Sequence, residues 1–237
     1  MKPEFIYFDL DNTLLDHSSA EKEAQTDIYH TYPELQQVQL DEWLSAYKAL
    51  NHQLWLSYQN GKIGRQELQR TRFKGSMDQL GLDSSRSEEI GSNYMLQYRK
   101  HWNWLEGARD AFDAIRHHYP VGIITNGFTE TQQKKFEFMG LREFCEIFII
   151  SEEVGVMKPH HKVFDVATEK AGVERDSILY VGDSYSSDIK GGRQAGWKTA
   201  WYTAFTNGMD SSRYSEADFS FDEFPELVSF LTAQLRK

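Results

Sequence analysis

Short runs of consecutive hydrophobic residues recur along the chain, and each run ends at a polar or small residue. The clearest runs cover residues 5–8, 121–124, 147–150 and 178–181, and a weaker run covers residues 199–202. The hydrophobic residues in these runs are continuous rather than alternating, which is typical of strands buried on both faces. The pattern therefore predicts a parallel sheet that is covered by helices on both sides.

Segments with helical spacing separate these runs. Residues 129–132 have the Thr-x-x-Gln spacing of a capping box, which predicts the start of one helix. Further helices are expected to end at Gly172 and, from about Ser187, at Gly196, because glycine is favoured just after the last helical turn. An amphipathic closing helix is expected after Pro225. The alternation predicts an α/β fold with a doubly wound, parallel, Rossmann-like sheet.

The stretch of residues 16–101 interrupts this alternation. It contains no strand-like run, but hydrophobic residues recur at three- and four-residue steps over residues 40–54, and residues 85–88 have the spacing of a second capping box. A crossover between parallel strands needs only about a dozen residues, so the stretch predicts an inserted helical-bundle domain. We therefore expect residues 1–15 and 102–237 to form the α/β core, with residues 16–101 as a helical cap.

Composition narrows the classes of function. The chain has 237 residues, a net charge of −10 and a single cysteine, Cys145, so no internal disulfide can form. A net negative charge disfavours binding to nucleic-acid polymers. The longest hydrophobic runs are too short to span a bilayer. The first run begins at Phe5, which leaves no room for a signal peptide. We therefore expect a cytoplasmic protein that contacts no membrane.

Candidate chemistry gathers at one edge of the predicted sheet, because ligands of open α/β sheets bind beyond the carboxyl ends of the strands. The polar residues that follow the strands are four acids, a hydroxyl and a lysine, namely Asp9, Asp11, Thr125, Lys158, Asp183 and Asp188. Carboxylates so close together repel one another unless a cation neutralises them, and oxygen ligands suit Mg²⁺. The lysine and the hydroxyl could hold an anion beside the metal, most simply a phosphoryl group.

Each of these motifs taken singly has a simpler explanation. Asp-x-Asp after a hydrophobic run is more often a solvated turn, and Thr-Asn-Gly after a strand is usually a turn as well. Gly-Asp-x4-Asp fits a helix N-terminus, where the helix dipole favours acids. The order of the motifs after successive buried strands favours one common site over these separate explanations.

Together the motifs resemble those of the haloacid-dehalogenase-like (HAD) hydrolase superfamily, and the resemblance covers essentially the whole chain. The ordered set is Asp9-x-Asp11-Asn12-Thr13, Thr125-Asn126-Gly127, Lys158-Pro159 and Gly182-Asp183-x4-Asp188. The helical insertion after the first motif is similar to the four-helix cap of the family. Residues 54–63, 72–73, 125–129 and 151–155 are similar to the bacterial house-cleaning 5′-nucleotidase branch, which acts on pyrimidine nucleoside monophosphates. Gly64 stands where that branch usually has a Ser or Thr helix cap, and glycine can serve there with little loss.

The resemblance implies a hydrolase of phosphate esters that acts through a covalent intermediate. Asp9 would attack phosphorus and form an aspartyl-phosphate, which water then hydrolyses. Asp11 would protonate the leaving alkoxide and afterwards take a proton from the attacking water. An acid at position 11 favours phosphoester cleavage over halide removal, since a leaving halide needs no proton. The expected partner is a small phosphate ester, above all a nucleoside 5′-monophosphate.

The resemblance also implies which groups hold the metal and the phosphoryl group. Mg²⁺ is the implied cofactor, and its ligands would be the Asp9 carboxylate, the Asp11 backbone carbonyl and Asp183. Asp188 would orient Asp183 or Lys158 without binding the metal directly. The phosphoryl oxygens would be bound by three groups as charge moves over them: Thr125, the Asn126 backbone and Lys158.

Two alternatives on the same fold stay open, because a sugar-phosphate phosphatase and a phosphomutase share all four motifs and differ in the cap. A phospho-acceptor receiver domain also uses paired acids, a hydroxyl and a lysine, but it lacks a helical insertion of this size. Substrate choice is expected to lie in the cap, with residues 14–18 and 100–106 as its hinges. The sequence is compatible with either a monomer or a homodimer.

The insertion contains aromatic and basic side chains that could in principle contact a nucleotide. The rings that could stack on a base are those of Trp43, Trp55, Tyr58 and Phe73. Helical spacing favours a role for them in the hydrophobic core of the cap itself. Three arginines, Arg65, Arg70 and Arg72, are expected to be ordinary exposed helix charges.

Overall fold

The computed structural model describes residues 2–145, 147–206 and 211–235. The chain divides into two compact units, one built from residues up to Asp16 and from Asn103 onward, the other from His17–Trp102. We call them the α/β unit and the helical unit. Each boundary lies one residue later than the division expected from the sequence.

The described strands of the α/β unit form one sheet in the order β3-β2-β1-β4-β5-β6, and every neighbouring pair is parallel. The strands are β1 (Phe5–Phe8), β2 (Val121–Thr125), β3 (Ile147–Ile150), β4 (Ile178–Gly182), β5 (Lys198–Tyr202) and β6 (Phe219–Phe221). This arrangement confirms the predicted parallel α/β fold. The sixth strand, β6, was not predicted, because two of its three residues are only partly buried and the three do not make a continuous hydrophobic run.

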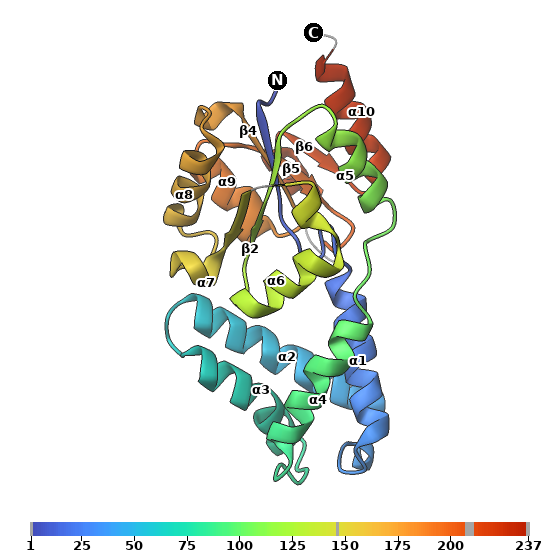
Figure 1. Ribbon diagram of the computed structural model, residues 1–237. Coiled ribbons are helices and arrows are strands. Elements are labelled where there is room, and N and C mark those ends of the chain that lie inside the picture. The colour runs from blue at the N-terminus through green and yellow to red at the C-terminus, as the bar shows by residue number, and fades with distance from the viewer. Residues whose placement is uncertain (1, 146, 207–210, 236–237) are drawn as a thin grey trace. The chain divides into compact units, whose positions relative to one another are not determined.

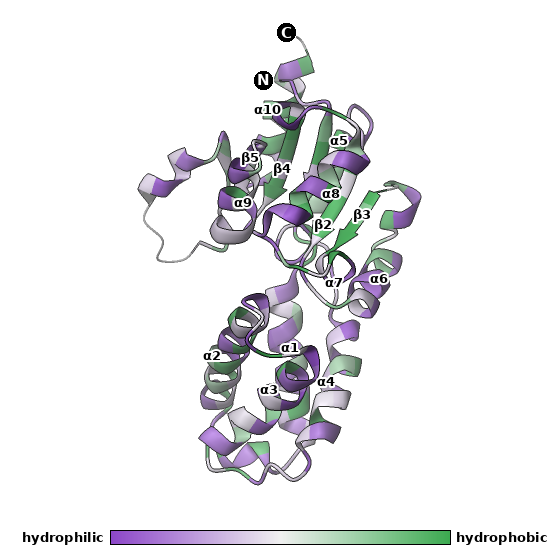
Figure 2. Ribbon diagram, turned by 90° about the vertical axis from the view of Figure 1, so that its left-hand side faces the viewer, coloured by the Kyte–Doolittle hydropathy of each residue, from purple (hydrophilic) through white to green (hydrophobic). Residues whose placement is uncertain are grey.

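Helices cover both faces of the sheet, as the continuous hydrophobic runs require. Figure 1 shows α8 (His161–Ala171) and α9 (Lys190–Gln194) on one side and α5 (Ala108–Arg116) and α10 (Phe224–Leu235) on the other. Figure 2 shows β2 and β3 in the green of hydrophobic residues. All residues of β1, β2 and β4 are buried. Burial of each large apolar side chain stabilises the fold by about 1.5–3 kcal/mol, so this core is the main source of stability.

The α/β unit has further helical segments. They are α6 (Thr129–Phe138), α7 (Ser151–Val154), the 3-10 turns η2 (Leu141–Glu143), η3 (Arg175–Ser177) and η5 (Ser211–Glu216), and the π-helical turn η4 (Tyr185–Ile189). Gly172 and Gly196 end helical segments with positive φ, as predicted. The helix expected from Ser187 to Ala195 instead begins with the wider η4 turn, in which the Ile189 amide donates to the Ser184 carbonyl.

Two polypeptide connections join the α/β unit to the helical unit, and inside the α/β unit they pair with each other. The Asp16 amide donates to the Asn103 carbonyl at 2.9 Å, and the Leu105 amide donates to the Leu14 carbonyl at 2.8 Å. Leu15 and Trp104 form an antiparallel bridge. The predicted hinge segments therefore lie side by side, and their role as hinges stays a prediction.

The helical unit consists of α1 (His17–Thr31), the 3-10 turn η1 (Leu35–Gln37), α2 (Leu40–Gln59), α3 (Arg65–Gln79) and α4 (Ser87–Lys100). Gly64 is the N-cap residue of α3, as expected. The capping box predicted at residues 85–88 does not form. The Ser85 amide donates to the Asp83 carboxylate at 2.9 Å, and α4 begins only at Ser87 with no side-chain cap. A local Asp turn therefore replaces the predicted helix start.

Aromatic residues make the core of the helical unit. Trp43 and Phe73 are fully buried together with Tyr47 and Tyr94, and the Tyr47 ring centroid lies 5.0 Å from that of Phe73. This confirms the core interpretation for Trp43 and Phe73. The prediction that Arg72 is exposed is wrong, because only 8% of the residue is accessible and its guanidinium lies over the Phe73 and Tyr94 rings at 5.3 and 5.2 Å. Arginine can be buried in this way because its planar group stacks on aromatic faces.

Among the described residues, no helix has both the length and the apolar character needed to cross a membrane. Cys145 is buried, as expected for a residue just before a strand, and burial raises the pKa of its thiol to about 12.

Candidate active site

Parallel pairing brings the motifs of three strands to one edge of the α/β unit. Phe8, the last residue of β1, pairs with Ile123 of β2 on one side and with Val181 of β4 on the other. Asp9 and Asp183, which follow these strands, are therefore neighbours at the carboxyl end of the sheet. Thr125 ends β2 at the same edge and is only 1% exposed.

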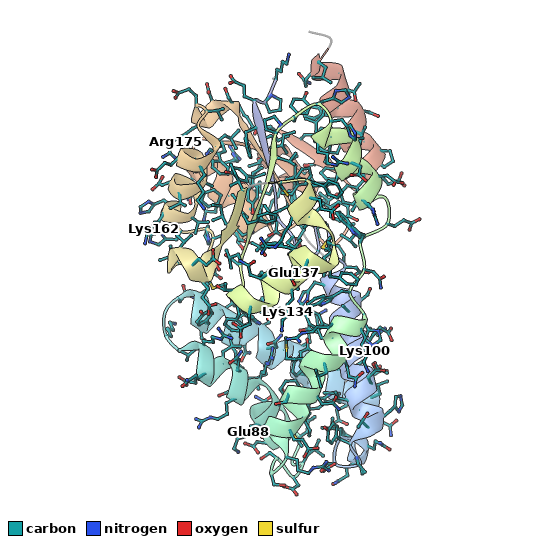
Figure 3. All side chains as sticks on the ribbon, viewed as in Figure 1. Glu88, Lys100, Lys134, Glu137, Lys162 and Arg175 are labelled. Atoms are coloured by element: carbon teal, nitrogen blue, oxygen red, sulfur yellow. The ribbon has the colours of Figure 1, made fainter. Side chains whose placement is uncertain are left out.

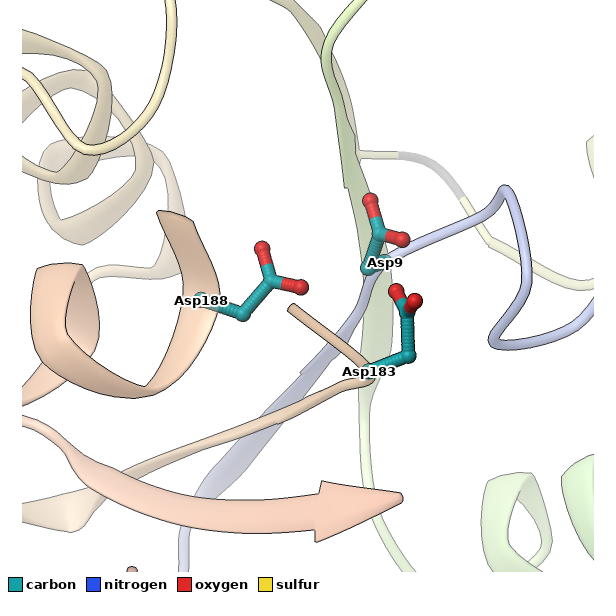
Figure 4. Close-up of side chains that lie close together, drawn as sticks. All are labelled: Asp9, Asp183 and Asp188. Carbon is teal, nitrogen blue, oxygen red and sulfur yellow. The ribbon is translucent and has the colours of Figure 1, made fainter. Parts of the chain in front are cut away.

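Three carboxylates meet there. Oxygen atoms of Asp9, Asp183 and Asp188 all lie within 4.8 Å of one another, and Figure 4 shows the Asp183 and Asp188 side chains directed toward the Asp9 carboxylate. The Thr13 hydroxyl bridges the first two, with its oxygen 3.3 Å from Asp9 Oδ2 and 3.4 Å from Asp183 Oδ1. A carboxylate cluster this tight needs positive charge nearby.

The pKa values of Asp9 and Asp183 are raised, which reflects the cost of placing these carboxylates close together in a partly dry environment. Burial raises the pKa of Asp9 to about 7, with the Asp188 charge adding to the rise and Lys158 opposing it. Burial also raises the pKa of Asp183 well above its ordinary value, and the charges of Asp9 and Asp188 raise it further. Both carboxylates are thus poorly compensated by the protein alone.

Lys158 is the cation at the centre of this cluster and is only 2% exposed. Its Nζ atom lies 2.6 Å from Asp9 Oδ1 and 2.8 Å from Asp188 Oδ1, and it donates to the Tyr180 hydroxyl at 2.6 Å. Burial opposes its charged form, but the Asp188 and Asp9 carboxylates outweigh burial and raise the pKa of the lysine. Lys158 is therefore protonated at neutral pH. The Lys158-Pro159 peptide bond is cis.

Asp188 is held by contacts that keep it beside Lys158. Its Oδ2 atom accepts a hydrogen bond from the Ser184 amide at 3.0 Å, while Oδ1 accepts from Lys158. The side chain packs against Gly182, where an added Cβ atom would come within 2.5 Å of Asp188 Oδ2. Glycine is needed before Asp183 because the Asp188 carboxylate occupies the space that a side chain would take.

The Thr125-Asn126-Gly127 motif ties the loop before α8 to the edge of the sheet. Asn126 Nδ2 donates to the Lys158 carbonyl at 3.1 Å, and Asn126 Oδ1 accepts from the Lys158 amide at 2.8 Å. The Gly127 amide donates to the Ser151 hydroxyl at 3.2 Å. The Asn126 side chain thus fixes the backbone that carries Lys158, which the sequence did not reveal.

Asp11 does not join the other acids. Its carboxylate points to α6, where Lys135 Nζ lies 2.6 Å from Oδ1 and Gln132 Nε2 donates to Oδ2 at 3.0 Å. The expectation that four acidic side chains converge is therefore corrected to three. The chain turns sharply after Asp11, since Asn12 has a positive φ of 61° and its amide donates to the Leu15 carbonyl.

Three residues that shape the site were not identified from the sequence, namely Tyr180, Gln132 and Lys135. Tyr180 sits inside a hydrophobic run and reads as core, yet its hydroxyl contacts Lys158 and lies 3.2 Å from Asp188 Oδ1. The capping box predicted at residues 129–132 is wrong. The Thr129 amide donates to Glu152 Oε2 at 2.7 Å and not to the Gln132 side chain. The Gln132 side chain donates to Asp11 instead.

The donor set fits a small divalent cation. It offers only oxygen atoms, and its three carboxylates outnumber the one lysine that pairs with Asp9 and Asp188, so negative charge is in excess. Hard cations such as Mg²⁺ prefer carboxylate oxygens. Asp188 accepts hydrogen bonds from Lys158 at 2.8 Å and from the Ser184 amide at 3.0 Å, whereas Asp183 Oδ1 and Asp9 Oδ2 share only the longer contacts with the Thr13 hydroxyl, so Asp9 and Asp183 are the better candidates for direct ligands.

Comparison with known proteins agrees with this geometry. The sequence pattern of the haloacid dehalogenase-like hydrolase family matches residues 6–202. Pyrimidine 5′-nucleotidase YjjG of Escherichia coli (strain K12) is 38% identical over 212 residues, which cover 86% of this chain and 88% of that relative. Pyrimidine 5′-nucleotidase PynA of Streptococcus pneumoniae is 31% identical over 201 residues, covering 84% and 83%.

Solved structures show the same fold. The HAD-hydrolase YfnB of Bacillus subtilis, solved bound to magnesium, has a TM-score of 0.84 at 26% identity and covers 98% of this chain and 100% of its own. L-2-haloacid dehalogenase from Xanthobacter autotrophicus, at 17% identity, has a TM-score of 0.72 over 98% and 99% and shows the fold alone. These matches confirm the resemblance inferred from the four motifs. The chain belongs to the haloacid dehalogenase-like hydrolases.

Proposed function

We propose that the protein is a Mg²⁺-dependent phosphomonoesterase that hydrolyses nucleoside 5′-monophosphates through an aspartyl-phosphate on Asp9. The observation that carries this proposal is the cluster of three carboxylates at the carboxyl edge of the sheet, two of which contact the buried Lys158. The preference for nucleotides rests on the two relatives named as pyrimidine 5′-nucleotidases. The helical unit would act as the cap that selects the substrate.

In the proposed first step, the Asp9 carboxylate attacks phosphorus in line, and the ester P–O bond breaks as the new P–O bond forms. Asp11, which enters this step protonated, gives its proton to the leaving alkoxide and becomes a carboxylate. In the second step, water attacks phosphorus, Asp11 takes a proton from it, and the Asp9 carboxylate is released with inorganic phosphate. Asp11 can serve both steps because its side chain is turned away from the three clustered acids.

The other residues would bind and orient the phosphoryl group. The cation would be held by the Asp9 and Asp183 carboxylates and the Asp11 backbone carbonyl, and when bound it supplies Lewis-acid stabilisation of the phosphoryl charge. Thr125, the Asn126 backbone and Lys158 would contact the phosphoryl oxygens. Asp188 would hold Lys158 in place, which its 2.8 Å contact with the lysine supports.

Phosphate release from a panel of nucleoside monophosphates tests the proposal. We expect release with Mg²⁺ present and a loss of at least about 100-fold when EDTA removes the ion, because the Asp9 and Asp183 charges are then uncompensated. Hexose phosphates and p-nitrophenyl phosphate belong in the same panel. A preference for hexose phosphates would favour the sugar-phosphatase alternative, and isomerised product would favour the phosphomutase. No release from any ester would refute the proposal.

Binding of Mg²⁺ to the metal-free protein is expected to raise its thermal midpoint more at high pH than at low pH. The pKa of Asp9 is raised to about 7 and that of Asp183 is raised too. A raised pKa of an acid means that stability is full below its ordinary value near 4 and is lost as pH rises through the folded value. The ion replaces the lost protons, so saturating Mg²⁺ should raise the midpoint by about 5–10 °C at pH 8.

At pH 5 the same ion competes with protons on both acids, so the shift should be close to zero. Differential scanning fluorimetry at both pH values measures the two shifts, and NaCl at equal ionic strength controls for screening. Equal shifts at pH 5 and pH 8 would contradict binding at these acids.

The proposed partner is a small phosphate ester. Cytoplasmic location and a monomeric or homodimeric state stay predictions.

A further inference from the structure

Lys135 of α6 is a buried cation that the proposed chemistry does not use. Its side chain is only 4% exposed, although lysine is seldom buried unless it is paired. Its Nζ atom lies 2.6 Å from Asp11 Oδ1, on the side away from the three clustered acids. A buried lysine contributes no net stability without such a partner. Its position is therefore explained by Asp11.

Gln132 holds the other oxygen of the same carboxylate. It lies three residues before Lys135, so both side chains project from one face of α6. Its Nε2 atom donates to Asp11 Oδ2 at 3.0 Å, and Thr125 Oγ1 lies 2.5 Å from the same nitrogen. Gly127 leaves room for this amide, since a Cβ atom there would come within 3.0 Å of Gln132 Cδ.

The two contacts fix the Asp11 side chain in one orientation, because each carboxylate oxygen has its own donor. Gln132 also contacts both Asp11 and Thr125, so it fixes the position of Asp11 relative to the end of β2. Lys135 is 4% exposed in its side chain and Gln132 is 1% exposed, whereas the Asp11 side chain is 23% exposed. The two donors are therefore held by the protein interior, and only Asp11 is appreciably accessible to solvent.

We propose that Lys135 and Gln132 are positioning residues that aim the Asp11 carboxyl group at the leaving oxygen and at the attacking water. This inference rests on the proposed phosphomonoesterase function. Neither residue needs to touch the substrate, because each acts through Asp11. The consequence is that their loss should matter only while Asp11 is present. In the ester-cleavage step, which kcat/KM reports, it should matter only for leaving groups that need a proton.

The test is a double-mutant cycle of Lys135→Met and Asp11→Asn, read as kcat/KM, which reports the steps through departure of the leaving group. For a nucleoside monophosphate, Lys135→Met should lower kcat/KM by about 10–100-fold, the cost of a misplaced catalytic group. For p-nitrophenyl phosphate, whose leaving group needs little protonation, the loss should stay below about threefold. In the Asp11→Asn background the Lys135→Met change should cost less than about threefold on either ester.

Lys134→Met is the matched control, since Lys134 is the exposed neighbour on the same helix (Figure 3) and its replacement should change kcat/KM less than about twofold. Lys135→Arg, which restores a donor, should recover part of the lost rate. Gln132→Met, which removes the amide at similar length, should show the same dependence on the leaving group. This second variant keeps the test decisive if Lys135→Met unfolds, which circular dichroism shows.

An active unmodified protein whose Lys135→Met loss persists undiminished in the Asp11→Asn background would overturn the inference alone. Equal losses on both esters would overturn it as well, because they indicate a general structural effect or direct substrate binding. An unmodified protein that releases phosphate from no ester would overturn the proposed function and this inference together.

Discussion

Replacement of Asp9 by asparagine is expected to abolish phosphate release, lowering kcat by at least about 10⁵-fold, the scale seen when a covalent nucleophile is removed. An amide oxygen is neutral and cannot form the acyl phosphate. The fold should survive, because the substitution takes one negative charge out of a cluster in which burial raises the pKa of Asp9 to about 7. The metal-free variant should therefore melt at a temperature equal to or above that of the unmodified protein at pH 8.

Two measurements separate these effects, namely phosphate release with Mg²⁺ and thermal melting without it. Asp176→Asn is the matched control, since Asp176 is exposed and lies in the turn before β4. That variant should retain full activity. An Asp9→Asn protein with more than about 1% of the normal rate would exclude Asp9 as the nucleophile. A folded but inactive variant that melts well below the unmodified protein would contradict the charge argument.

The architecture of the α/β unit could be predicted because buried parallel strands leave a simple signal in the sequence. Four strands were found where continuous hydrophobic runs occur, and β5 was found from a weaker one. The short strand Phe219–Phe221 was missed, since it lies at the edge of the sheet and Ser220 interrupts its hydrophobic residues. Edge strands are held by pairing on one side only, and hydrophobic periodicity records burial rather than pairing.

Helix starts were harder to predict, because the same spacing serves different purposes. Thr129 and Gln132 have the spacing of a capping box, but Glu152 from a distant segment binds the Thr129 amide. Gln132 instead contacts Asp11, and this contact could not be predicted from local sequence spacing because the two residues are far apart in the chain. Tertiary contacts outweigh a local preference of about 1 kcal/mol in such cases.

The clustered acids could be predicted because each follows the end of a strand, where the fold itself decides which residues meet. Their supporting residues could not. Tyr180 lies within a buried strand, and its hydroxyl is directed at Lys158 only in the folded chain. Arg72 likewise reads as an exposed helix charge, while the aromatic faces that bury it come from α3 and α4. Sequence patterns show the position of a side chain along a helix or strand, but they do not show which residue of another segment it contacts.

The charge balance of the site leads to the second large expected effect, at Lys158. Replacement by methionine leaves the Asp9 and Asp188 carboxylates buried without their shared cation, and breaking a buried ion pair in this way costs about 3–5 kcal/mol. The pKa of Asp9, which Lys158 now lowers, should rise further in the variant. Because the stability of an acid with a raised pKa is lost as pH rises through that value, the destabilisation should be larger at pH 8 than at pH 5.

A second substitution distinguishes the structural role of Lys158 from its proposed catalytic role. Lys158→Met combined with Asp188→Asn removes one charge of each sign, so the double variant should recover most of the stability at pH 8. Its phosphate release should stay about 10²–10³-fold low, since no cation replaces the one proposed to stabilise the phosphoryl oxygens. Lys170→Met, on the exposed side of α8, is the matched control and should change neither property. Recovery of activity together with stability would show that Lys158 only balances charge, and the phosphate-binding role would have to pass to Thr125 and the Asn126 backbone.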